Sequence, residues 1–224
     1  MNAVQKELRL DRQPRHIECF DNSNLQGAHP VASCVVFRDG KPSRKEYRHF
    51  NIKTVTGADD YASMREVVFR RYTRLMAEGA EMPDLIIADG GKGQMGVIHE
   101  VLERLGLDTP IAGLAKDDRH RTAELLCGFP PVLVGIRPTS PLFHFLAHIQ
   151  EEVHRFAVSF HRQKRSKAFI HSELEQIEGV GDKTVQTLLR HFRTVEKVRA
   201  ANIEELSALV GAAKAKKIRA FFEK

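Results

Sequence analysis

The sequence contains no tryptophan, few cysteines and no apolar run long enough to cross a membrane. Cys19, Cys34 and Cys127 are too few and too widely spaced for a disulfide framework or a cysteine-based zinc site. A membrane-spanning helix needs about 20 consecutive apolar residues, and the polar N-terminus does not resemble a secretory signal peptide. We therefore expect a cytoplasmic globular protein without disulfides and without a membrane partner.

The charge balance is basic. The 224 residues include 35 Lys and Arg against 29 Asp and Glu, which gives a net charge of +6. A basic surface favours polyanionic partners such as nucleic acids but does not require them. The length is sufficient for one or two domains with a sizeable core.

The N-terminal third predicts three antiparallel strands. After a polar lead-in over residues 1–14, we expect a strand over 16–21 that places Asp21 at its end. Asn22 to Gly27 predicts a turn, and a second strand is expected over 30–37. Asp39-Gly40 indicates a hairpin, with the returning strand over 44–52.

A long helix is predicted from Asp59-Asp60 to about Glu78. Its apolar positions follow a helical period: Ala62, Val68, Phe69, Tyr72 and Leu75. Asp59 and Asp60 lie at the expected N-terminus, where carboxylates are favoured by capping and by the helix dipole. A structural role and a functional role both remain open for this pair.

Asp89 is the strongest candidate for a functional carboxylate. Leu85 to Ala88 predicts a buried strand, and a glycine-rich turn after Asp89 leads into a helix over 94–105. Ligands of open α/β sheets bind at the carboxyl ends of such strands. The turn lacks the spacing of a nucleotide-binding phosphate loop. The simplest alternative is that Asp89 only caps the helix.

The next segment is less regular. We expect strands over 110–114 and 132–136, separated by an irregular stretch over 117–131, and then a helix from Thr139 or Ser140 to about His161. That helix carries His144, His148 and Glu152 at helical spacing. Because no further ligand is evident, the spacing is weak support for a zinc site.

The C-terminal tail is expected to be helical. A basic run over 162–167 predicts a solvated linker or a hinge that faces phosphates. Beyond it, Gly179-Val180-Gly181 with Lys183 predicts a helix-hairpin-helix that binds the DNA backbone. A second copy contains Gly211 and Lys214, but Leu209 replaces its first hairpin glycine, so we expect that copy mainly to pack against the first.

The order of elements is that of an RNase H-like α/β fold, a mixed sheet with flanking helices. In that topology the first and fourth expected strands are parallel neighbours, which places Asp21 beside Asp89. Two adjacent carboxylates repel each other unless a cation lies between them, and Mg²⁺ or Mn²⁺ is the natural choice. His154 on the late helix is a candidate ligand or general base. For His154 alone, a purely structural histidine is the simpler interpretation.

Several segments in register resemble one family. They are Ile17–Ser23, Gly57–Met64, Asp89–Gln94 and His154–Arg162. Together with the tandem hairpins they resemble the C-terminal half of UvrC, the excinuclease subunit of bacterial nucleotide excision repair. The resemblance covers nearly the whole chain. It implies an endonuclease domain over 1–161, a basic linker over 162–171 and a tandem helix-hairpin-helix domain over 172–224.

The resemblance also implies roles for residues and partners. Asp21, Asp89 and His154 match the positions that make the 5′ incision beside a bulky lesion with Mg²⁺ or Mn²⁺, and Asp60 matches a further acidic position. The expected DNA-binding positions are Gly179, Val180, Gly181, Lys183, Gly211, Lys214 and Lys92. Lys116 and Arg155 are additional candidates for phosphate contacts on charge and position alone. The expected partner is lesion-containing duplex DNA, and in the full-length protein the UvrB–DNA complex.

Some features depart from the family. The family often has His where Asn24 stands and Asp where Glu151 stands, and neither position is assigned to catalysis. The N-terminal nuclease and the segment that docks on UvrB have no counterpart, so we expect a monomeric part of a longer protein with little ability to find damage alone. Two other classes remain open: a DNA-binding module without catalysis, and an RNase H-like enzyme with another substrate, such as an RNA–DNA hybrid or a branched junction.

Overall fold

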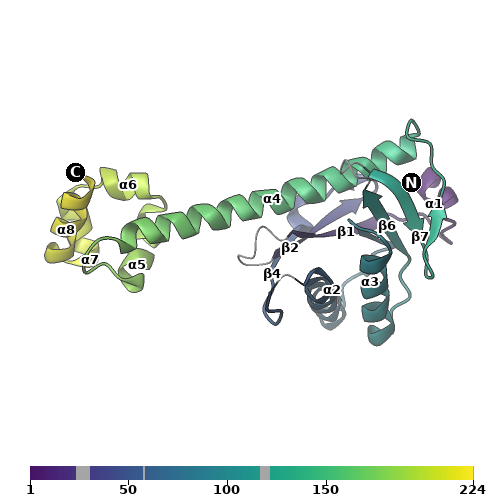
Figure 1. Cartoon of the computed structure of the whole chain (residues 1–224), viewed down its shortest axis with the longest axis horizontal. Coiled ribbons are helices and arrows are strands. Elements are labelled where there is room, and N and C mark those ends of the chain that lie inside the picture. Colours follow the sequence, from purple (N-terminus) through teal and green to yellow (C-terminus); the bar gives the residue numbers. More distant parts are fainter. Residues whose placement is uncertain (24–30, 58, 117–121, 224) are drawn as a thin grey trace. The chain divides into compact units, whose positions relative to one another are not determined.

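The computed structural model describes residues 1–23, 31–57, 59–116 and 122–223, without the side chains of Ser23, Lys116, residues 122–123 and residues 161–172 (Figure 1). The chain divides into two compact units, residues 1–161 and 162–224, and each is described by itself. Within the described residues, every helix is too short or too polar to cross a membrane.

The first unit is built on one mixed sheet, whose strand order is β3-β2-β1-β5-β6-β7-β8 with β4 paired to β2. The strands are β1 His16–Ser23, β2 Val31–Arg38, β3 Lys41–Pro42, β4 Arg48–Asn51, β5 Leu85–Ala88, β6 Ile111–Lys116, β7 Thr122–Cys127 and β8 Val132–Val134. The helices are α1 Asn2–Glu7, the short 3₁₀ helix η1 Arg44–Glu46, α2 Asp60–Ala77, α3 Lys92–Leu105 and α4 Pro141–Glu175. This arrangement confirms the predicted RNase H-like fold class.

The pairing of β1 decides where the candidate site forms. β1 runs antiparallel to β2 and parallel to β5, with Phe20 opposite Ala88. The Asp89 N–H then donates to the Phe20 carbonyl at 2.8 Å. Asp21 and Asp89 therefore follow directly on paired residues of adjacent parallel strands, as predicted from the order of elements.

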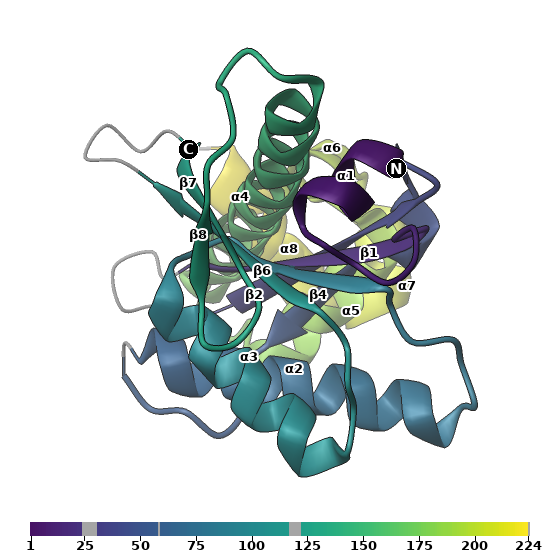
Figure 2. The ribbon, with the colours of Figure 1, turned by 90° about the vertical axis from the view of Figure 1, so that its right-hand side faces the viewer.

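Helices cover both faces of the sheet. Figure 2 shows α2 and α3 on one face and α1 and the start of α4 on the other. Side chains alternate along β1: Phe20 packs edge-on against Tyr72 of α2, whereas Asp21 faces His154 of α4. The candidate site therefore lies on the α4 face of the sheet.

The hairpin after β2 forms as predicted, but the returning strand is shorter. Asp39 and Gly40 adopt positive φ angles of 48° and 79°, as a tight hairpin turn requires. The predicted strand over 44–52 begins only at Arg48, because residues 44–46 form η1. The Glu46 carboxylate accepts hydrogen bonds from Ser43 and Arg38, and these contacts favour the helical turn.

Four further expectations for this unit need correction. The stretch 117–131 is not irregular throughout, because β7 pairs with β6 through Leu125 and Leu126; residues 117–121 lie outside the described part. The lead-in over 1–14 contains α1, whose Val4 is buried, and the following Leu8 is buried as well. The helix expected to end near His161 extends to Glu175, since the basic run contains good helix formers and no proline or glycine. Asn22 and Ser23, predicted to begin a turn after a strand ending at Asp21, instead continue β1 and pair with Ala32 and Val31. The remainder of that predicted turn, from Asn24 to Gly27, lies outside the described residues.

The second unit contains the predicted hairpins around a small core of its own. Its helices after α4 are α5 Asp182–Phe192, α6 Val195–Ala200, α7 Ile203–Val210 and α8 Ala212–Phe222. Leu188, Leu206 and Ile218 from three of these helices are fully buried together. α6 was not predicted; it is short and is capped by Thr194, whose side chain accepts a hydrogen bond from the Lys197 N–H.

Candidate metal centre

Asp21, Asp89 and His154 lie together at one end of the sheet. One potential ligand atom from each residue lies within 4.8 Å of the others. Nδ1 of His154 is 3.7 Å from Oδ2 of Asp21. Asp21 lies within β1, directly after the residues that pair with β5, and Asp89 directly follows β5. The imidazole comes from the middle of α4. The structure thus gathers the three residues that the sequence proposes as a metal site.

The chemistry of this group fits a divalent cation. Asp21 and Asp89 are only 6% and 8% exposed, whereas the His154 side chain is 61% exposed. Oδ2 of Asp21 is buried, and none of the described residues donates a hydrogen bond to it. Buried polar atoms are almost always paired, so this oxygen is suited to an ion. Carboxylate oxygens are the ligands that Mg²⁺ and Mn²⁺ prefer.

Gln150 belongs to this site and was missed by the sequence analysis. Its Nε2 donates to Oδ1 of Asp89 at 2.5 Å and to the Leu114 carbonyl at 3.3 Å. Gln150 precedes His154 by four residues, so both side chains lie on one face of α4. The four-residue spacing from His154 is the signal in the sequence that points to Gln150. This spacing becomes informative only when the position of α4 on the sheet is known.

Asp60 lies near the three residues without belonging to the group they form. Its backbone carbonyl accepts a hydrogen bond from the Asn22 side chain at 2.7 Å. Partial burial, and then the negative charges of Asp59 and Asp21, raise the pKa of Asp60. The neighbouring Asp59 caps α2, since its carboxylate accepts the Ala62 N–H at 2.9 Å. The capping interpretation therefore holds for Asp59, whereas the pKa of Asp60 is affected by the negative charge of Asp21.

Packing accounts for part of the glycine-rich turn after Asp89, although Gly91 has open space around it. A Cβ on Gly90 would collide with the Gln94 side chain, and one on Gly93 would lie 2.4 Å from the Tyr61 hydroxyl. Across the sheet, a Cβ on Gly113 would lie 2.8 Å from the Gly90 carbonyl oxygen. Gly90, Gly93 and Gly113 thus make room for neighbouring parts of the chain.

The candidates for phosphate contacts differ in their surroundings. Lys92 is exposed on the first residue of α3, just beyond the turn after Asp89. The Arg155 guanidinium donates a hydrogen bond to the Glu152 carboxylate at 2.7 Å. Lys116 ends β6, but its side chain lies outside the described residues. Lys92 and Arg155 are therefore both exposed, but the Arg155 guanidinium is already engaged by a carboxylate.

The zinc hypothesis on α4 receives no support. The ring of His148 packs edge-on against Phe37, and the Glu152 carboxylate accepts a hydrogen bond from the Tyr47 hydroxyl at 3.0 Å. In the part of the chain that the structure describes, His144, His148 and Glu152 do not gather as potential ligands. Aromatic packing and the Tyr47 contact account for these positions.

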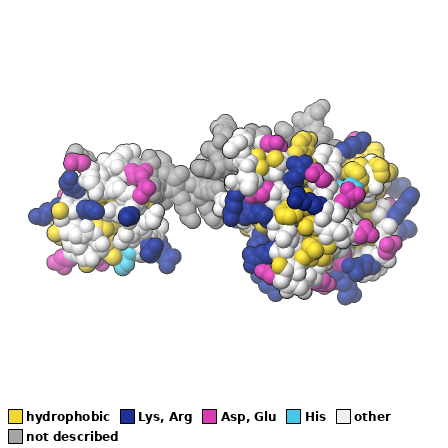
Figure 3. Space-filling view, turned by 90° about the horizontal axis from the view of Figure 1, so that it is seen from below, with side chains coloured by type: hydrophobic (Ala, Val, Ile, Leu, Met, Phe, Trp, Pro, Cys, Tyr) yellow, Lys and Arg dark blue, Asp and Glu magenta, His cyan; other side chains and the backbone are white. Residues whose placement is uncertain are grey.

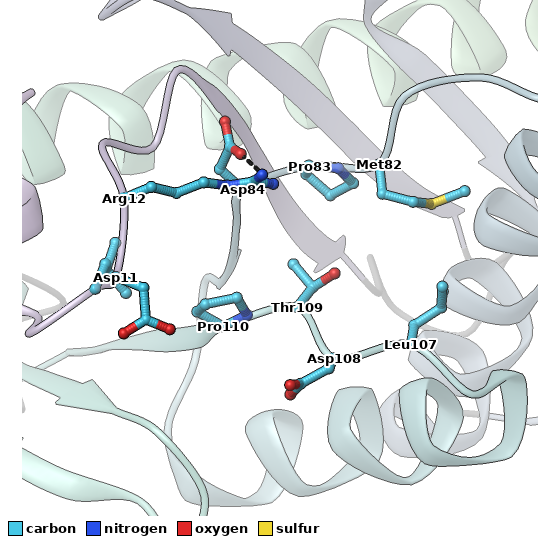
Figure 4. A pocket seen from close by; sticks show the side chains of 10 residues that line it. Asp11, Arg12, Met82, Pro83, Asp84, Leu107, Asp108, Thr109 and Pro110 are labelled. Atoms are coloured by element: carbon cyan, nitrogen blue, oxygen red, sulfur yellow. Dashed lines mark ion pairs between the residues drawn. The ribbon is translucent and has the colours of Figure 1, made fainter.

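Two other features of the first unit lie away from the candidate metal centre. The side of α2 and α3 carries positive and negative side chains intermixed (Figure 3), and Arg65 and Arg70 are paired with Glu100 and Glu66. A cavity of about 560 Å³ opens at the amino ends of β5 and β6, where Arg12 and Asp84 form an ion pair (Figure 4). Because this cavity lies at the other end of the parallel strands, it is separate from the candidate metal centre.

In the second unit, the first hairpin has the predicted backbone. Gly179 has φ of 82°, and Gly181 is the N-cap of α5. The Val180 side chain is buried, and the backbone N–H of Val180 donates to the Ile177 carbonyl at 2.9 Å. Lys183 is exposed in the first turn of α5. Val180 thus anchors the turn, while the helix N-terminus and Lys183 are placed for an anion.

Lys214 of the second hairpin is directed at the first. It follows Gly211, whose φ is 85°, and its Nζ contacts Oγ1 of Thr184 in α5 at 3.0 Å. Lys217, one turn further along α8, pairs with Glu178 beside the first hairpin turn at 3.2 Å. Cations of the second copy therefore lie beside the first hairpin, in keeping with the expected packing of the two copies.

Comparison with known proteins gives matches along most of the chain. The family model of the UvrC RNase H endonuclease domain matches residues 5–158, and that of the SAM-like helix-hairpin-helix tandem matches residues 172–224. UvrABC system protein C of Bacteroides fragilis is 59% identical over 219 residues, covering 98% of this chain and 36% of that protein. The protein of the same name from Streptococcus uberis is 57% identical over 203 residues, covering 90% of this chain and 34% of that protein. The chain thus spans about a third of the length of these relatives.

Two solved structures that match the chain do so distantly. Endonuclease V of Ciona intestinalis bound to DNA is 16% identical with a TM-score of 0.35, covering 52% of this chain and 57% of that one. Human endonuclease V is 11% identical with a TM-score of 0.37, covering 69% and 86%. At these scores the likeness adds nothing to the fold and the site described above.

Proposed function

Because the chain belongs to the UvrC RNase H endonuclease domain family, we propose that it makes the incision on the 5′ side of a bulky lesion in bacterial nucleotide excision repair. The observation that supports this proposal is the group of Asp21, Asp89 and His154, whose two carboxylates come from adjacent parallel strands. The reaction would hydrolyse one phosphodiester bond and leave 3′-hydroxyl and 5′-phosphate ends. A cytoplasmic location and a monomeric state belong to the same proposal.

Asp21 and Asp89 would hold the cation, which we propose to be Mg²⁺ or Mn²⁺. When bound, such an ion lowers the pKa of water and neutralises charge that develops on a phosphate. The burial of both carboxylates keeps competing water away from them, and the paired backbones of β1 and β5 fix their separation. The protein therefore presents a preformed pair of oxygen ligands at an edge of the sheet.

His154 is the group that faces the substrate side. Its exposure allows it to meet a phosphate or a water, and the Asp21 carboxylate near Nδ1 favours an orientation with Nε2 turned away from the carboxylates. As a general base it would accept a proton from the attacking water at Nε2. As a ligand it would instead help to hold the cation. Asp60, with its raised pKa, would add a further acidic group at the rim.

The helix-hairpin-helix unit would bind the DNA backbone without reading its sequence. Gly179, Gly181 and Lys183 form the first hairpin, and Lys214 adds a cation from the second. Amides at a helix N-terminus and lysine side chains are typical phosphate contacts and carry little sequence information. Beside the metal site, Lys92 would contact a phosphate near the bond that is cut.

A nicking assay tests this function. The substrate is duplex DNA with one bulky lesion, already cut on the 3′ side and loaded with UvrB, and the reaction contains Mg²⁺, Mn²⁺ or a chelator. We expect a metal-dependent cut 5′ to the lesion and little cutting of an undamaged duplex or an RNA–DNA hybrid. Preferential cutting of the hybrid would favour a different RNase H-like enzyme. Tight binding without cutting under every metal condition, even after the N-terminal half of the family protein is added back, would favour a DNA-binding module.

A further inference from the structure

We propose that Gln150 is a positioning residue that fixes the Asp89 carboxylate for the cation and sets the register of α4 over the sheet. The inference rests on the proposed function, because it assumes that Asp89 holds a metal. Gln150 does not touch the substrate or the reacting atoms in this proposal. It acts through Asp89 and, along the helix, through His154.

The contacts of Gln150 are buried and directional. Gln150 is 5% exposed, and its amide nitrogen donates to Oδ1 of Asp89 and to the Leu114 carbonyl of β6. A carboxylate only accepts hydrogen bonds, so the side-chain NH₂ group is the part of the glutamine that suits this position. Its two donors join the end of β5 to the neighbouring strand. Rotation of the Asp89 carboxylate away from this orientation would break a buried hydrogen bond, which is costly.

The spacing of Gln150 and His154 matches the spacing of the two strands. Four residues of an α-helix rise about 6 Å, and neighbouring strands lie about 4.8 Å apart. One turn of α4 is therefore long enough to reach two neighbouring strands. Gln150 contacts the carboxylate of Asp89 after β5, and His154 faces the carboxylate of Asp21 in β1. A helix that slid or turned would lose both contacts at once.

A neutral donor is suited to this role. A cationic side chain at this position would compete with the metal for the Asp89 charge, whereas a carboxylate would repel it. The glutamine amide holds one oxygen and leaves the carboxylate its full negative charge. Groups that orient metal ligands in this way typically account for about 10–100-fold in metal affinity.

The test measures Mn²⁺ binding to the purified protein by the electron paramagnetic resonance signal of free Mn²⁺. Gln150→Met keeps the length and the helix propensity of the side chain but removes its hydrogen bonds. Gln150→Asn keeps the amide but is one methylene too short to reach Asp89. Gln186→Met makes the same chemical change at an exposed position of α5 and serves as the matched control. Thermal unfolding confirms that each variant is folded.

We expect both Gln150 variants to bind Mn²⁺ about tenfold or more weakly than the wild type, while the control is unchanged. In the nicking assay, higher Mg²⁺ should restore much of the lost rate, which a purely structural defect would not allow. Should Gln150→Met fail to fold, Gln150→Asn carries the test.

Unchanged Mn²⁺ affinity in the folded Gln150 variants, together with weakened binding in Asp89→Asn, would overturn this inference and leave the proposed metal site intact. Absence of Mn²⁺ binding by the wild type, or binding that Asp89→Asn does not affect, would overturn both proposals.

Discussion

Replacing Arg71 with methionine should destabilise the first unit strongly, because it removes the permanently charged partner of a buried carboxylate. Glu18 lies on β1, three residues before Asp21, and is fully buried. The Arg71 guanidinium, which is 10% exposed, donates to both of its carboxylate oxygens. The Tyr72 hydroxyl donates at 3.1 Å, and the Cys34 thiol lies at 3.7 Å.

The sign of the pKa shift agrees with a charged pair. Burial alone opposes ionisation of Glu18, but the contacts with His16 and Arg71 outweigh it, and the pKa of Glu18 is lowered. Removal of one partner from a buried pair typically costs about 3–5 kcal/mol. We expect Arg71→Met to fall in this range. Glu18→Gln should cost less, because the remaining arginine retains some exposure and can reach water.

A double-mutant cycle measures the coupling. The free energies of unfolding of wild type, both single variants and Glu18→Gln/Arg71→Met are obtained from urea titrations followed by far-ultraviolet circular dichroism. The double variant should be more stable than Arg71→Met alone, since it buries no unpaired charge. A cost below about 1 kcal/mol for Arg71→Met, or strictly additive effects, would refute this description of the buried pair.

Two further changes test other parts of the first unit. Gly113→Ala should lower the free energy of unfolding by about 1–3 kcal/mol and slow nicking, because its Cβ would lie 2.8 Å from the Gly90 carbonyl oxygen beside Asp89. Gly135→Ala, which has open space around it, is the control. Equal urea midpoints for the two variants would contradict the prediction. The Arg38 guanidinium holds the pKa of Glu46 down to about 2. Stability from this pair should be present above the ordinary carboxyl pKa of 4.5 and be lost as the pH falls from 4.5 towards 2. After allowance for solvent screening, Glu46→Gln should lower the free energy of unfolding by about 1 kcal/mol at pH 7 and by almost nothing near pH 2. Chemical unfolding at both pH values measures this difference, and a loss that does not depend on pH would contradict the assignment.

Local sequence patterns were sufficient to predict the frame of the site. Asp89 follows a short apolar strand, Asp21 lies near the end of β1, and the parallel pairing of these strands brings the two residues side by side. This prediction needed only the alternation of side chains and the topology. The hairpin glycines were predicted for the same reason, because their turn geometry is local and Gly179 requires a positive φ.

Features that depend on contacts across the sheet could not be predicted in this way. Gln150 is unremarkable in the sequence, and its role depends on how α4 lies over β5 and β6. Glu18 is likewise one charged residue in a strand until Arg71 of α2 is placed beneath it. β7 was missed because it is stabilised by backbone pairing with β6, and that pairing cannot be read from the residues of β7 alone.

The length of α4 shows a different limit. The run of basic residues predicted a linker from charge, but lysine and arginine are also good helix formers, and nothing in the run ends a helix. Lys214 was assigned to its own hairpin, yet its ammonium group lies at Thr184 of the first. In both cases the sequence showed the charge of the residue but did not show which part of the structure the residue would contact.

A comparison of Asp89→Asn with Asp108→Asn tests the proposed centre. Asp108 is exposed and lies before β6, at the opposite end of the parallel strands. Single-turnover cutting of the UvrB-loaded lesion duplex, already cut on the 3′ side, is measured in Mg²⁺. We expect Asp89→Asn to lose about two or more orders of magnitude in rate, since a positioned metal supplies several kcal/mol, and Asp108→Asn to cut like the wild type. Equal rates for the wild type and Asp89→Asn, or cutting that persists in a chelator, would contradict a metal-dependent nuclease at this site.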